Sequence, residues 1–124
     1  MTRAELIEAL ETAQGADREL DRDIADAIGA GPPSDWARKP RIADGCINFD
    51  CGSWVSPCGG LIRHSLSYTG LIDAAMMLAT GDMDNADIGV MLNEAAYKCI
   101  LAGCDIRTDL PRFIAAACLR AGGE

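Results

Sequence analysis

The chain has 124 residues, and its 19 acidic side chains outnumber 11 basic ones for a net charge of −8, which argues against direct nucleic-acid binding because that requires clustered lysine and arginine. Its length and 49% hydrophobic content fit a single domain over residues 1–124 that can bury a core without metal or disulfides. It has no apolar run of the ~20 residues of a membrane span and no signal peptide, so we expect a cytoplasmic protein with reduced cysteines.

Two amphipathic helices are predicted at the N-terminus. Thr2 and Glu5 have the spacing of a capping box before a helix over about residues 3–13, and Gly15 ends it. A second helix is predicted over about residues 17–29, where Pro32 and the glycines before it prevent continuation. Its apolar stripe consists of Leu20, Ile24, Ala27 and Ile28. Its charged residues are predicted to face water: Asp21, Arg22, Asp23 and Asp26.

The character of the sequence changes over residues 41–68, where strand-forming side chains are interrupted by glycine and proline. Residues 34–39 are predicted to connect the second helix to this region, with Trp36 covering one side of the core. Polar and apolar residues alternate over residues 46–51, as in a strand with one wet face, and residues 61–68 are predicted to form a further strand. We therefore predict a small antiparallel sheet over about residues 42–68.

Three further helices are predicted in the second half of the chain. The first covers about residues 70–80 and is capped by Thr69. The second covers about residues 85–102 and begins after Asp84, with Asp87 in its first turn. The third covers about residues 109–120 and is capped by Asp109, with Pro111 in its first turn. The apolar stripe of the middle helix consists of Ile88, Met91, Leu92, Ala95, Ala96 and Cys99. The predicted fold class is therefore α+β: a helix-rich single domain with a small central antiparallel sheet packed by helices.

The central segment over residues 46–64, which contains three of the six cysteines, allows two interpretations. Cys46, Cys51, Cys58 and His64 are the residue types of a structural zinc site, which would give a zinc-stabilised interaction module. However, the spacing C-x4-C-x6-C-x5-H lacks a close C-x2-C pair, and strand alternation places Cys46 and Cys51 on opposite faces. We favour the second interpretation, in which these cysteines are small core residues and no cofactor is bound.

Other candidate features have ordinary structural explanations. Cys99, Cys104 and Cys118 lie on or near apolar helical faces, which favours core packing. His64 with a nearby cysteine is a candidate nucleophile pair, but no carboxylate is placed to orient its ring, so we predict no catalytic residue.

The acidic stripe of the first two helices is most simply a face exposed to water. The alternative is that this face binds a basic groove of another molecule. This stripe comprises Glu5, Glu8, Glu11, Asp17, Glu19, Asp21, Asp23 and Asp26. Self-association is a further possibility, because several methionines exceed what one small core can cover: Met76, Met77, Met83 and Met91.

Three segments resemble the small phage and prophage proteins of the phage ABA sandwich domain family: LIEALETAQGADRELDRDIA at residues 6–25, LSYTGLIDAAMML at residues 66–78 and AAACLRA at residues 115–121. The resemblance implies a helix–sheet–helix layering in a bacterial host's cytoplasm, and brings no established activity or catalytic residues. The family usually continues with strands after the second segment, whereas this chain has a helical pattern there. We therefore expect a non-enzymatic accessory protein that binds another protein, such as a host or bacterial-defence component.

Overall fold

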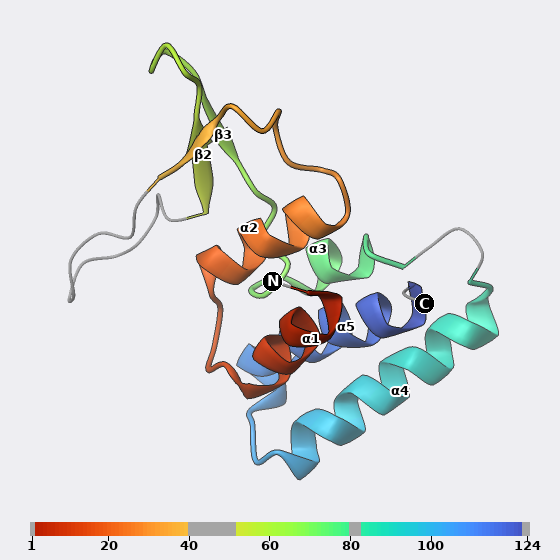
Figure 1. Ribbon diagram of the computed structural model, residues 1–124. Coiled ribbons are helices and arrows are strands. Elements are labelled where there is room, and N and C mark those ends of the chain that lie inside the picture. Colours follow the sequence, from red (N-terminus) through yellow and green to blue (C-terminus); the bar gives the residue numbers. More distant parts are fainter. Residues whose placement is uncertain (1, 40–51, 80–82, 123–124) are drawn as a thin grey trace. The chain divides into compact units, whose positions relative to one another are not determined.

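The computed structural model describes residues 2–39, 52–79 and 83–122. These residues form, in chain order, α1 (Arg3–Thr12), α2 (Arg18–Ala27), β1 (Ala37–Arg38), β2 (Ser53–Val55), β3 (Ile62–His64), α3 (Ile72–Met76), α4 (Asn85–Leu101) and α5 (Ile106–Gly122) (Figure 1). The predicted class, a helix-rich α+β protein with a small antiparallel sheet, is confirmed. None of the helices in the described part of the chain is long and apolar enough to cross a membrane.

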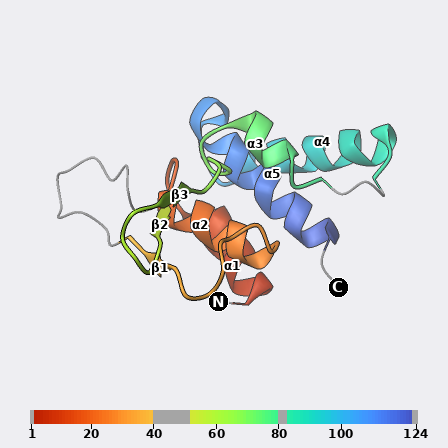
Figure 2. The same cartoon turned by 90° about the horizontal axis from the view of Figure 1, so that it is seen from above.

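The chain divides into two compact units: a helical unit, residues 1–17 with 67–124, and a sheet unit, residues 18–66. In the helical unit, α5 is the central element. Six of its seven residues from Phe113 to Leu119 are buried, because α1, α3 and α4 all pack on it. The helices α1 and α4 lie on different sides of α5 (Figure 1, Figure 2). The other buried apolar residues of this unit include Leu6, Leu10, Ala74, Ala75, Met91, Ala95 and Cys99. The prediction of core packing is confirmed for Cys99 and Cys118. The single-domain organisation stays a prediction.

Two of the predicted helix starts are confirmed. Thr2 Oγ1 accepts a hydrogen bond from the Glu5 amide at 3.1 Å, and Glu5 Oε1 accepts one from the Thr2 amide at 2.8 Å. Asp84 and Asp87 make the same reciprocal pair at the start of α4. Both boxes satisfy amides that have no partner within the helix.

Two other predicted caps are wrong. Thr69 does not cap α3, which begins at Ile72 and ends at Met76; its buried hydroxyl instead accepts from the Asp17 amide at 2.8 Å and donates to the Asp17 carbonyl at 3.1 Å. Asp109 does not cap α5, because Asp105 accepts from the Arg107 amide at 2.9 Å and the helix begins at Ile106. Pro111 therefore lies in the second turn.

In the sheet unit, the strands pair antiparallel in the order β1-β2-β3. The register places Ala37 opposite Val55, Ser53 opposite His64 and Val55 opposite Ile62. The turn between β2 and β3 contains Gly59 at φ +74°, a left-handed conformation that favours glycine. Two outcomes differ from the prediction: β1 lies in the expected connector, and the strand expected over residues 61–68 ends at His64. Residues 40–51, part of the predicted sheet, lie outside the described residues.

The prediction that the charged residues of α2 face water is wrong for Asp21 and Arg22, which are both buried. Arg22 Nη1 donates to the carbonyl oxygens of Lys39 and Ser53, both at 2.9 Å, and Arg18 Nη1 lies 2.7 Å from Asp21 Oδ2. The carbonyls of Ser53, in β2, and of Lys39, directly after β1, need donors, and a guanidinium on α2 supplies them. The helical periodicity of α2 contains no sign of this non-local requirement.

Candidate functional site

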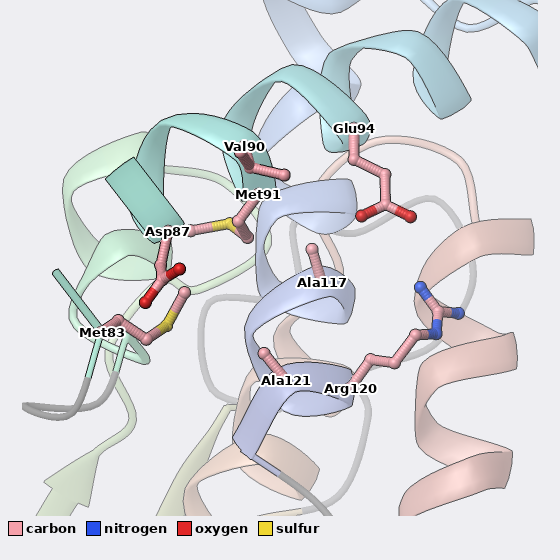
Figure 3. Close-up of a pocket in the computed structure, with 8 residues that line it drawn as sticks. All are labelled: Met83, Asp87, Val90, Met91, Glu94, Ala117, Arg120 and Ala121. Atoms are coloured by element: carbon pink, nitrogen blue, oxygen red, sulfur yellow. The ribbon is translucent and has the colours of Figure 1, made fainter. Parts of the chain in front are cut away.

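A cavity of the helical unit lies where α4 and α5 pack and measures about 440 Å³ (Figure 3). It is lined by Met83, Asp87, Val90, Met91 and Glu94 from α4 and the segment before it, and by Ala117, Arg120 and Ala121 from α5. We call this set the α4–α5 groove. Figure 3 shows Met83 and Asp87 at one end, Glu94 and Arg120 at the other, and the two alanines on the floor between them.

The walls of the α4–α5 groove are apolar and its rim is charged. Small floor residues let another chain approach closely, and the flexible thioethers of Met83 and Met91 can adapt to its side chains. Asp87 and Glu94 place two carboxylates along the α4 rim. An occupant with apolar side chains and a basic group matches this lining.

Ion pairs with α1 determine the charge at the Arg120 end. Glu11 accepts hydrogen bonds from Arg120 Nη2 through both carboxylate oxygens, each at 3.2 Å, and Glu11 Oε2 lies 3.7 Å from Lys98 Nζ. Lys98 is also 4.0 Å from Glu94 Oε1. Glu11 and Glu94 are compensated by Arg120 and Lys98, so with Asp87 the groove and the ion pairs at its end keep one net negative charge.

The outward side of α4 is the second candidate surface. Val90, Tyr97, Ile100 and Leu101 are among the most exposed large apolar residues that the structure describes, whereas Met91, Ala95 and Cys99 on the inward side are buried. The core of the unit buries only one side of such a helix, so its second apolar side remains exposed to solvent. The sequence analysis identified the inward stripe and missed the outward one, although its spacing was visible in the sequence.

The structure does not bring together Cys58 and His64, the two predicted zinc ligands that it describes. Cys46 and Cys51 lie outside the described residues. Cys58 is an exposed free thiol in the turn after β2, and His64 ends β3 opposite Ser53, so they occupy opposite ends of the hairpin. Among the residues that the structure describes, no group of three or more His, Cys, Asp or Glu side chains is arranged to hold a metal ion.

The hairpin nevertheless contains two polar contacts of chemical interest. Hydrogen bonds from the Ser56 hydroxyl and the Gly60 amide lower the pKa of the Cys58 thiol, and the Ser56 Oγ–Cys58 Sγ distance is 3.2 Å. Ser53 Oγ lies 2.6 Å from His64 Nδ1. Ser53 is fully buried, so its hydroxyl is inaccessible to a substrate, and the contact orients the exposed imidazole ring.

Comparison with known proteins assigns no function to these surfaces. No family model matches the chain, and no curated protein or solved structure is significantly similar to it. The resemblance to the phage ABA sandwich family therefore stays a prediction. The groove and the outward side of α4 have to be interpreted from their own chemistry.

Proposed function

We propose that this chain is a non-enzymatic accessory protein of the phage or prophage type that acts by binding another protein in the cytoplasm of a bacterial host. The α4–α5 groove is the observation that carries the proposal, because it combines an apolar floor with a carboxylate rim. The partner segment is an amphipathic helix or extended peptide with Lys or Arg beside its apolar residues. A host protein or a bacterial-defence component with such a segment is the proposed target.

Two further observations support a basic partner. The net charge of −8 favours encounter with a positive surface and opposes encounter with an acidic one. The carboxylates of Asp87 and Glu94 are both on exposed residues, so an incoming basic side chain reaches them without desolvating a buried ion. The phage assignment itself rests on the sequence resemblance.

The test uses two matched substitutions. Ala121→Glu places a carboxylate on the groove floor, and Ala27→Glu makes the same change at an exposed position in the last turn of α2. Both changes add one negative charge near a helix C-terminus, so their general effects on the helix are similar. A tagged chain first captures its partner from host lysate, and the purified partner is then titrated against each variant.

We expect Ala121→Glu to weaken binding at least about tenfold, because its longer side chain occupies the apolar floor that the partner's apolar side chains need, and Ala27→Glu to change it by less than about twofold. Equal binding by both variants would place the contact elsewhere on the chain. A purified chain that retains no partner but turns over a small molecule would overturn the proposal.

A further inference from the structure

The outward side of α4 has a residue spacing that is the same in both directions along the helix. Val90, Glu94, Tyr97 and Leu101 follow one another at intervals of four, three and four residues, so they form one narrow stripe. Val90, Tyr97 and Leu101 have exposed fractions of 68%, 62% and 67%. We call these four residues the α4 stripe.

We propose that the α4 stripe binds the α4 stripe of a second copy of this chain, with the two helices antiparallel about a twofold axis. The symmetric spacing brings Val90 level with Leu101 of the other copy, and Glu94 level with Tyr97. Alternating intervals of three and four residues are those of a helix–helix seam, and an isologous interface requires one surface to be complementary to itself. The α4 stripe meets both conditions without any change in the backbone.

The polar centre of the α4 stripe favours the antiparallel orientation over the parallel one, while the net charge of −8 on each copy opposes their association and keeps it weak. In an antiparallel pair, the Tyr97 hydroxyl can donate to the Glu94 carboxylate of the other copy. Lys98, whose ammonium lies 3.7 Å from Glu11 and 4.0 Å from Glu94 of its own chain, follows one residue further along. A parallel pair in register would instead place Glu94 against Glu94. A carboxylate in the middle of an apolar seam is costly unless it is paired, so the polar centre disfavours the parallel arrangement.

The predicted interface is small and reversible. The 17 residues of α4 span about 25 Å at ~1.5 Å per residue, and a single helix pair of that length buries less than a typical stable dimer interface. We therefore expect dissociation constants in the range of roughly 10 µM to 1 mM. This inference goes beyond the proposed function, since it concerns the purified chain alone. Val90 and Glu94 belong to both surfaces, whereas Ala121 belongs only to the α4–α5 groove.

The first experiment measures the mass of the purified chain by analytical ultracentrifugation as a function of concentration. We expect a monomer–dimer equilibrium that Val90→Asp and Leu101→Asp each abolish over the range tested. Met77→Asp, at the exposed apolar residue that follows α3, and Ala121→Glu are controls expected to leave the equilibrium within about twofold. A parent chain that stays monomeric up to millimolar concentration would overturn the proposal, as would dimers that survive both stripe substitutions.

The second experiment tests the polar centre by exchanging charges. Glu94→Lys and Lys98→Glu should each raise the dissociation constant at least about tenfold, and the double variant should return to within about threefold of the parent chain. Circular dichroism melting of each variant separates loss of folding from loss of pairing. A double variant no better than the single ones contradicts the antiparallel register.

The third experiment tests orientation by disulfide formation. Residues 90 and 101 of one helix are ~16 Å apart along its axis, so a bond between cysteines at these positions has to join two copies. Under mild oxidation, the Val90→Cys/Leu101→Cys variant should form a 90–101 disulfide detectable by peptide mass mapping, and neither single variant should form a 90–90 or 101–101 bond. Bonds between identical positions would show a parallel pair and overturn the proposal.

Discussion

The carboxylate of Asp109 lies 2.6 Å from Nη2 of Arg112, and this guanidinium is completely buried. The same carboxylate accepts a hydrogen bond from the Gly15 amide at 2.9 Å, and Arg112 Nη1 donates to the Leu10 carbonyl. One ion pair of α5 therefore satisfies both a carbonyl near the C-terminus of α1 and an amide of the segment after it. Its loss should affect the entire helical unit.

We predict that Asp109→Asn lowers the free energy of unfolding at neutral pH by about 2 kcal/mol or more. The hydrogen bonds from Arg112 and Gly15 lower the pKa of Asp109 from 3.8 to about 2. Because the folded-state pKa is lower than the unfolded one, this stabilisation is present above pH 3.8 and is lost as the pH falls towards 2. Urea unfolding curves of both proteins, measured across this range, give the difference directly.

Asp35→Asn, at an exposed position in the loop before β1, is the control and should change stability by less than about 0.5 kcal/mol. The difference between the parent chain and Asp109→Asn should shrink at low pH, where the parent loses the same charge. A constant difference from neutral pH down to pH 2 would show that the carboxylate charge is not responsible.

The accuracy of the sequence predictions depends on how far apart the interacting residues are. The caps at Thr2 and Asp84 use partners three residues along the chain, and the sequence predicts both. The Thr69–Asp17 contact spans 52 residues and the Arg112–Leu10 contact spans 102, and neither leaves a periodic pattern. Local caps are predicted correctly at α1 and α4 but not at α5, where Asp109 is recruited by Gly15 and Asp105 caps the helix instead; polar groups recruited from another element are assigned to solvent or to a local cap.

The candidate site shows the same division. The inward face of α4 follows from its helical periodicity, and the residues Met91, Ala95 and Cys99 are buried as predicted. The α4–α5 groove depends on how two helices meet and on Glu11, which lies 109 residues from Arg120 in the chain. The helical periodicity of the sequence does not indicate how α4 packs against α5, so the groove was found only in the structure.

Arg22 is predicted to be essential for the sheet unit. Arg22→Met removes the donor that Nη1 supplies to the carbonyls of Lys39 and Ser53, and both carbonyls then lose a partner. Since hydrogen bonds from a charged donor are worth about 1.5–3 kcal/mol each, we expect a loss of about 3 kcal/mol in urea unfolding. Arg63→Met removes one exposed bond to the Ala30 carbonyl and should cost less than about 1 kcal/mol. Equal losses from both substitutions would refute the role of burial.

Cys58 is predicted to be the most reactive of the four cysteines that the structure describes. Its thiol is exposed and its pKa is lowered by Ser56 and Gly60, whereas burial raises the pKa of Cys118 to about 11 and also raises that of Cys99. At neutral pH, alkylation followed by peptide mass mapping should label Cys58 at least about tenfold faster than Cys99 or Cys118. Ser56→Ala should slow labelling of Cys58 because it removes a hydrogen bond to the thiolate. Faster labelling of a buried cysteine would indicate that the helical unit opens.

The final prediction concerns the zinc alternative for Cys46, Cys51, Cys58 and His64. The β2–β3 register separates Cys58 from His64, and Ser53 engages the Nδ1 atom of the imidazole, so these two residues do not form half of a tetrahedral site as they stand. We therefore expect elemental analysis of the purified chain to give well below one zinc per chain, and Cys58→Ser to leave the melting temperature within about 2 °C. Stoichiometric zinc that is lost together with folding in Cys58→Ser would establish the zinc-stabilised module instead. His64→Gln is the matching test at the other end of the hairpin: it can keep a hydrogen bond to Ser53, so it should preserve stability unless the ring binds metal.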